Sequence, residues 1–205
     1  WTNTNTSIGL SGQSTGDIAA FVSENTSLVD QTATITVVPD FNGCEGEPQT
    51  FTITVKPTPA VVIAPETQTL CSGQLTQEID FSEDLIGTTY EWTNDNVSIN
   101  LDPSGNGNIT PFIVENLGLN PQAATISVTP TFNECVGVAD TALIIVNPIS
   151  TVIIAPGVDE YCHGETTTEY TFDSNNPGTQ YSWTNSNSSI GLSENGIGNI
   201  APFVV

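Results

Sequence analysis

The chain has 205 residues, and its 23 Asp and Glu stand against one basic residue and one His, so the formal net charge is −22. A nucleic-acid-binding protein uses Lys and Arg to displace counterions from phosphates, and an anionic membrane surface would repel this chain, so both partners are excluded. Only 12% of the residues are charged and 37% are hydrophobic, which is the composition of a chain that folds.

Residue usage favours strands and export. Val, Ile and Thr favour strands over helices, while Thr, Asn, Ser and Gly fill the places that Lys, Glu and Arg occupy in a cytosolic protein. We therefore expect an all-β, extracellular protein. No stretch approaches the roughly 20 apolar residues of a membrane span, so we expect no direct membrane insertion. The chain has no Met, and we expect an internal piece of a longer protein whose targeting signal lies outside this sequence.

The tripeptide Trp1-Thr2-Asn3 reveals an internal repeat. The same tripeptide starts again at Trp92 and at Trp183, so the period is 91 residues without a gap. The register holds along the chain, and the recurring residues include Phe21 with Phe112 and Phe203, Pro39 with Pro130, Cys44 with Cys135, Cys71 with Cys162, and Tyr90 with Tyr181. So many matches in one ungapped frame predict tandem domains.

Two proline-containing linkers divide the chain. Residues 56–59 and 147–148 follow alternating stretches, and proline suits a short, stiff connection because it cannot donate to a strand ladder. We expect three segments, called the first, middle and third segment below. Residues 1–57 would be the C-terminal part of one repeat, 58–148 a complete repeat, and 149–205 the N-terminal part of a third.

The middle segment contains seven predicted strands. In chain order they cover residues 60–64, 76–81, 89–93, 98–101, 109–114, 124–129 and 142–146. Apolar and polar residues alternate in the last two predicted strands, as half-buried strands require. Residues 103–108 are rich in Gly, Asn, Ser and Pro, so we expect a turn there. Seven short strands in about 90 residues with a central Trp predict an immunoglobulin-like β-sandwich. Its expected core includes Trp92, Tyr90, Phe112, Ile126 and Val128.

Several motifs of the middle segment together resemble a known family. They are Cys71-Ser-Gly, Gly87-Thr-Thr-Tyr90-Glu-Trp92-Thr-Asn94, Ala124-Thr-Ile-Ser-Val-Thr-Pro130, Cys135-Val-Gly137 and Val146-Asn-Pro148. They are similar to the PKD-like repeat of Bacteroidetes surface proteins, which is strung in large numbers in type IX-secreted adhesins, including those of gliding motility. The resemblance covers the whole chain and implies a cell-surface stalk with no catalytic residues and no cofactor. The Trp-Asp-Phe-Gly-Asp-Gly core of the standard PKD domain is replaced here by Trp92-Thr-Asn-Asp-Asn.

No group of residues in the sequence indicates catalysis or zinc binding. The single histidine, His163, has Ser72 as its counterpart in the preceding repeat, and an unrepeated His is a poor candidate for the base of a hydrolytic triad. Cys71 and Cys162 each stand in Cys-x-Gly, without the Cys-x-x-Cys or His pair of a zinc site. We therefore expect a protein that is not an enzyme and that holds no cofactor.

Calcium is the metal that the sequence leaves open. Asp102, Asn106 and Asn108 lie in one Gly-rich loop, but Asp102 aligns with Ser11 and Ser193. A hard cation needs several fixed oxygen ligands, so we expect no metal site within a repeat, and binding at repeat interfaces stays open.

The cysteines allow two disulfide arrangements. Two cysteines per repeat in an exported chain suggest disulfides, and Cys71 and Cys135 are the full pair of the middle segment. In a simple sandwich these positions lie at opposite ends, whereas a disulfide needs Cα atoms about 4.4–6.8 Å apart. Either the segment before Cys71 rises toward Cys135, or each cysteine reaches a neighbouring repeat. Family usage implies one pair per domain, so we take Cys71–Cys135 as the expected bond.

The preferred functional hypothesis is a structural stalk segment of a long repetitive adhesin, serving adhesion or gliding motility by projecting a distal binding region from the cell. Its partners would be neighbouring repeats, with surface polysaccharide or other cell-surface components as candidates. The alternative is a carbohydrate-binding module in which Trp1, Trp92 and Trp183 stack on sugars, although a Trp on the third strand of such a sandwich is usually core.

Overall fold

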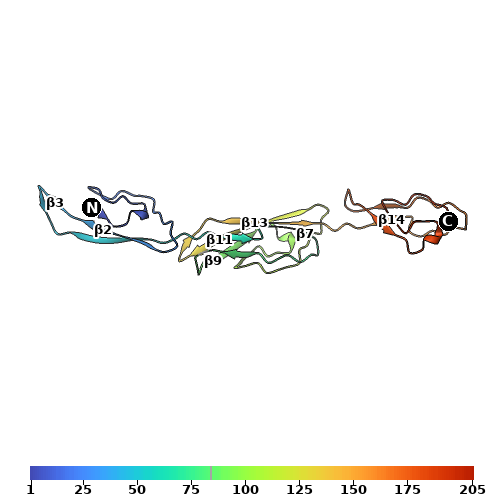
Figure 1. The fold of residues 1–205 in the computed structure, drawn as a ribbon, viewed down its shortest axis with the longest axis horizontal. Coiled ribbons are helices and arrows are strands. Elements are labelled where there is room, and N and C mark those ends of the chain that lie inside the picture. Colours follow the sequence, from blue (N-terminus) through green and yellow to red (C-terminus); the bar gives the residue numbers. More distant parts are fainter. Residues whose placement is uncertain (84) are drawn as a thin grey trace.

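The computed structural model describes residues 1–83 and 85–205, and these form strands, loops and three single-turn 3₁₀ helices. Three elongated parts follow one another along a line, with the N-terminus in the first and the C-terminus in the last (Figure 1). The 3₁₀ helices are Thr6–Ile8, Val97–Ile99 and Ser188–Ile190. The predicted all-β fold class is confirmed. In the described part of the chain, no helix is long and apolar enough to cross a membrane.

The middle segment is a sandwich of two sheets. The larger sheet has the order β10 (Ser104–Asn106), β9 (Thr89–Asn94), β11 (Gln122–Phe132), β13 (Asp140–Asn147) and β7 (Thr67–Cys71), and β12 (Cys135–Val136) pairs with the end of β11. The strand pairs in this sheet are antiparallel except for β7, which runs parallel to β13. Both β7 and β13 therefore run away from β12.

The smaller sheet pairs β6 (Val62–Ala64) with β8 (Asp80–Ser82), and the bridges Leu75–Ile113 and Ile79–Ile109 extend it. The chain switches sheets between β6 and β7, since β6 belongs to the smaller sheet and β7 to the larger one. Two facing sheets of mainly antiparallel strands with this connectivity make an immunoglobulin-like sandwich.

The other two segments contain strands that fall on strands of the middle segment when their residue numbers are shifted by 91, although several are shorter than their counterparts. In the first segment these are β1 (Thr2–Asn3), β2 (Gln31–Val37), β3 (Asp40–Phe41), β4 (Cys44–Glu45) and β5 (Gln49–Val55). In the third they are β14 (Ile153–Ala155), β15 (Thr171–Asp173), β16 (Ser182–Thr184) and β17 (Asn195–Ile197). The first segment thus has counterparts of β11 and β13, and the third has counterparts of β6, β8, β9 and β10.

The core of the middle segment lies between its two sheets. Ile126 and Val128 are fully buried and Trp92 is 7% exposed. Tyr90 and Phe112 are partly buried and pack against the same cluster. All five residues expected in the core therefore lie in it or at its edge.

Four local features of the middle segment differ from the prediction. The strand predicted at residues 98–101 is wrong: the Asn96 side chain accepts a hydrogen bond from Ser98 N and caps a 3₁₀ turn there. The turn predicted at residues 103–108 contains the strand β10, whose Gly105 lies opposite Trp92. A Cβ on Gly105 would lie 2.3 Å from the Trp92 ring, so glycine is present to admit the indole. The third difference is that residues 109–114, predicted as a strand, form only the isolated bridges of Ile109 and Ile113. The fourth is β7, which no sequence pattern predicts.

Candidate functional site: the junction between the first and middle segments

Lys56, the only basic side chain of the protein, joins the first segment to the middle one. It follows β5, and its Nζ donates a hydrogen bond to the carbonyl oxygen of Asn133 at 3.0 Å and lies 3.7 Å from the Glu134 carboxylate. The Glu134 side chain is 95% exposed, so the ion pair contributes little stability. The Lys56 contact instead places the end of the first segment against the turn between β11 and β12.

That turn has the geometry of a tight hairpin. Phe132 and Cys135 pair across it, and the two residues between them, Asn133 and Glu134, have φ of 46° and 71°. Two central residues with positive φ match the twist of antiparallel strands, and Asn is among the residues that tolerate this conformation best. The hairpin therefore presents the Asn133 carbonyl at the edge of the sandwich, where Lys56 reaches it.

The linker itself lies tightly on the middle sandwich. Pro57 is fully buried and Pro59 is buried as well. A Cβ on Gly137, just after β12, would lie 2.0 Å from the carbonyl oxygen of Pro59 and 2.8 Å from Cγ of Pro130. Only glycine allows the linker to come this close. The next residue is held too, since Ala60 N donates to the Glu83 carboxylate at 2.9 Å.

The structure does not bear out the predicted disulfide between Cys71 and Cys135. All four cysteines, which lie among the described residues, are free. Cys71 pairs with Asn147 at the far end of β13, whereas Cys135 lies in β12, beyond the other end of β13. The eight residues of β13 alone span roughly 23 Å at ~3.3 Å per residue, well beyond the reach of one disulfide. The segment before Cys71 therefore rises away from Cys135.

Repeated asparagines hold the loops of each segment, a role that was not predicted from the sequence. The Asn94 amide is buried and donates to the carbonyl of Leu101 at 3.1 Å. Its counterparts Asn3 and Asn185 each donate to the corresponding Leu carbonyl at 3.0 Å. The recurrence of the Trp-Thr-Asn tripeptide was the signal that could have revealed this role.

A second repeated asparagine ties a loop to the last strand. Asn116 is 6% exposed and donates to the carbonyls of Val146 at 2.7 Å and Asn120 at 2.9 Å. Asn25 makes the equivalent bonds to Val55 and Val29. These amides fix the end of the segment from which the chain leaves.

Of the residues considered as calcium ligands, Asn108 has other partners, and Asp102 and Asn106 are exposed. Asn108 donates to Asp80 at 2.7 Å and accepts from Phe81 N at 2.9 Å, so its amide links the loop to β8. His163 is exposed. Among residues 1–83 and 85–205, no group of three or more His, Cys, Asp or Glu side chains could hold a metal ion.

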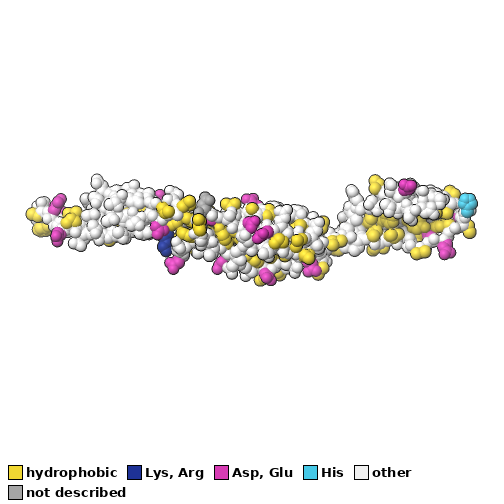
Figure 2. Space-filling model, turned by 60° about the horizontal axis from the view of Figure 1, so that its bottom comes forward, with side chains coloured by type: hydrophobic (Ala, Val, Ile, Leu, Met, Phe, Trp, Pro, Cys, Tyr) yellow, Lys and Arg dark blue, Asp and Glu magenta, His cyan; other side chains and the backbone are white. Residues whose placement is uncertain are grey.

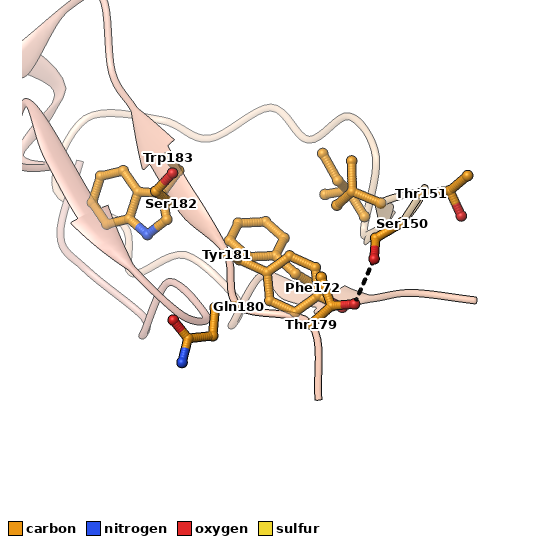
Figure 3. Close-up of a pocket in the computed structure, with 10 residues that line it drawn as sticks. Ser150, Thr151, Phe172, Thr179, Gln180, Tyr181, Ser182 and Trp183 are labelled. Carbon is orange, nitrogen blue, oxygen red and sulfur yellow. Dashed lines mark hydrogen bonds between the residues drawn. The ribbon is translucent and has the colours of Figure 1, made fainter. Parts of the chain in front are cut away.

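The third segment carries an apolar groove of about 390 Å³ (Figure 3). Ile154, Phe172, Tyr181 and Trp183 line it, and Thr179 donates to Ser150 at 3.2 Å on its rim. Figure 2 shows hydrophobic side chains gathered along this segment. The residues 91 positions earlier belong to the core cluster that also holds side chains of β11 and β13. The groove is therefore the inner face of a sandwich rather than a built ligand site.

Two tyrosines, Tyr90 and Tyr170, have a raised pKa. Burial, with a further contribution from the Glu83 charge, raises the pKa of Tyr90. Burial and then a hydrogen bond with Tyr161 raise the pKa of Tyr170 to about 12. Both groups stay protonated at neutral pH, so neither supplies acid–base chemistry there.

No family model and no curated protein matches the sequence. Among solved structures, the chain is similar to extracellular cadherin domains 1–5 of protocadherin gamma B2, with 15% identity and a TM-score of 0.30 over 84% of this chain and 38% of that one. It is also similar to the FN1–FN3 domains of chicken CNTN1, with 9% identity and a TM-score of 0.29 over 84% of this chain and 65% of that one. The chain spans less than two thirds of the length of both. The fold assignment rests on the sheet topology described above.

Proposed function

We propose that this chain is a structural segment of a cell-surface stalk that projects a distal binding region of a longer adhesin. The observation that carries the proposal is the anchored junction. Buried Pro57 and Pro59, the close approach of the linker to Gly137, and the Lys56 contact hold the first segment at one end of the middle sandwich. An anchored linker makes a spacer, because it limits bending between consecutive domains.

The strand order also suits a protein that is pulled at both ends. The chain enters the middle sandwich beside Gly137 and leaves it at Asn147, so its two ends lie at opposite ends of β13. A pull on both termini therefore slides β7 and β13 past each other. The hydrogen bonds that join them, such as Leu143 N to Glu66 O at 2.8 Å and Ser72 N to Asn147 O at 2.9 Å, must then break together.

The surface charge supports an extended arrangement. The net charge is −22, and acidic side chains are scattered over all three segments on the face that Figure 2 shows. Like charges keep such a chain soluble and oppose its collapse or self-association. A long projecting stalk benefits from both effects.

The resemblance to PKD-like repeats supports the finer part of the proposal: a type IX-secreted adhesin of the gliding-motility type, at the cell surface. Its partners would be the neighbouring repeats and, at a distance, polysaccharide or other surface components. The carbohydrate-binding alternative loses its main argument, because Trp92 is 7% exposed and packs in the core.

Single-molecule pulling tests the mechanical role. The middle segment is recognised by its contour length at up to ~3.6 Å per residue, which is about 90 residues for a pull through the chain termini and 76 residues for a pull between Cys71 and an Asn147→Cys substitution. It should resist a higher force in the first geometry than in the second. The second geometry peels β7 from β13 one bond at a time. Equal forces in the two geometries would contradict the proposed role.

A further inference from the structure

The two cysteines of the middle segment mark its two ends. Cys71 is the last residue of β7, is exposed, and lies beside Asn147, where the chain leaves toward the third segment. Cys135 begins β12, is half-buried, and lies at the end where the linker from the first segment arrives. Each cysteine therefore lies at an end of the sandwich that adjoins a neighbouring segment.

The junction at Lys56 shows which positions meet there. Lys56 stands 91 residues before Asn147, and Asn147 is the residue that Cys71 pairs with. In a preceding complete repeat, the counterpart of Cys71 would therefore pair with Lys56, at the strand spacing of ~4.8 Å. Lys56 contacts Asn133 and Glu134, and the next residue is Cys135. A cysteine of one repeat and Cys135 of the following repeat thus come to the same junction.

We propose that, in consecutive repeats, Cys71 of one repeat forms a disulfide with the counterpart of Cys135 in the next. The partner of Cys71 would lie 91 residues after Cys135, and the partner of Cys135 would lie 91 residues before Cys71, so neither position falls within residues 1–205. Cys44 and Cys162 follow the same rule. This arrangement is consistent with four free cysteines that recur at the period of the repeat.

Formation of the bond needs a disulfide donor such as oxidised glutathione. The thiolate of one cysteine attacks a donor sulfur and expels one donor thiolate. The second cysteine then attacks the protein sulfur of this mixed disulfide and expels the other thiolate. The donor gains two electrons and, with the two thiol protons of the protein, leaves as two thiols. Successive bridges overlap along the sequence, so each repeat is tied to both neighbours.

The inference concerns how repeats are joined and does not depend on adhesion, so its failure would leave the proposed function standing. The test extends the chain in its own frame: residues 1–205 followed directly by a second copy of residues 115–205. This protein has six cysteines, because the added copy brings one Cys135 and one Cys162. Circular dichroism first verifies that it is all β. Both proteins are then oxidised with glutathione, and their thiols are counted under denaturing conditions.

The extended protein should lose two thiols and keep four, whereas the 205-residue chain should keep all four of its own. The peptides around the original Cys135 and its added copy are identical, so the original Cys135 is replaced by Ser for mapping. Peptide mapping of this variant with an acid-specific protease should link Cys71 to the added copy of Cys135. Cys71→Ser should abolish the bond, and Cys162→Ser, the matched control, should leave it. Six free thiols in the extended protein, a Cys71–Cys135 bond in either protein, or bonds only between molecules would overturn the proposal.

Discussion

Gly137→Ala tests whether the linker is held on the middle sandwich. Gly137 does not have the positive φ that restricts several other glycines of this chain, so its backbone accepts alanine. The obstacle is space: the new Cβ would lie 2.0 Å from the Pro59 carbonyl oxygen and 2.8 Å from Pro130 Cγ. Both neighbours are parts of proline residues, which have few ways to move aside. The linker must therefore shift outward.

The expected cost follows from two opposing effects. Overpacking a tight site costs typically 1–3 kcal/mol. Replacing glycine with alanine restricts the unfolded chain and returns about 0.4–1 kcal/mol. We expect a net loss of about 1–2 kcal/mol in the free energy of unfolding, together with greater bending between the first and middle segments, since Pro57 and Pro59 lose their packing.

Denaturant unfolding measures the stability loss, and small-angle X-ray scattering measures the bending as a broader distribution of intramolecular distances. The matched control is Gly46→Ala, 91 residues earlier. There the new Cβ would meet only Pro39, with Cγ of its ring at 3.0 Å and its carbonyl oxygen at 3.8 Å. This change should cost no more than about 0.5 kcal/mol, as for an ordinary surface site. Equal effects of the two substitutions, or an unchanged scattering profile for Gly137→Ala, would refute the anchored linker.

Four further outcomes are expected. Trp92→Ala should lower the free energy of unfolding by about 3–5 kcal/mol in urea titrations, and a loss below about 1 kcal/mol would reopen a ligand-stacking role. Asn116→Ala should cost about 1–3 kcal/mol in the same assay, because the Val146 and Asn120 carbonyls lose their donor. The raised pKa of Tyr90 means that the folded state holds the phenol proton more tightly, so its contribution to folding stability is complete below about pH 10 and is lost above it. The denaturation midpoints at pH 9 and pH 11 should therefore differ less for Tyr90→Phe than for the unchanged protein. Millimolar calcium, or a chelator, should leave the melting temperature unchanged, and a rise of several degrees would show a site assembled between segments.

The strands that the sequence predicts well are those with a buried face. Alternation in residues 124–129 and 142–146 identifies β11 and β13, since every second side chain enters the core. The predicted strand at 89–93 falls on β9 for the same reason. β7 has no such pattern: it is a short Thr-Gln-Thr-Leu-Cys run that is held by parallel pairing with β13, more than 70 residues away. Local sequence cannot show a strand whose stability comes from a distant partner.

The disulfide prediction failed for the same physical reason. Which end of the sandwich receives Cys71 depends on the direction of β7, and that direction is set by its pairing with β13. The core residues could be predicted because burial is visible as periodicity. The junction could not, because the contact of Lys56 with Asn133 joins residues 77 positions apart that belong to different segments.

The near absence of basic residues explains how the polar part of the structure is stabilised. A chain with 23 Asp and Glu residues and one Lys cannot form networks of ion pairs, and this Lys lies at a junction between segments. Side-chain amides take over the role of donor. Asn3, Asn94 and Asn185 hold equivalent loops, and Asn25 and Asn116 hold the ends of β5 and β13. Neutral amides do not titrate, and their hydrogen bonds are less sensitive to salt than surface ion pairs. The internal hydrogen bonds of each segment should therefore persist over a wide range of pH and ionic strength, which leaves the repulsion between carboxylates as the part of the electrostatics that responds to salt.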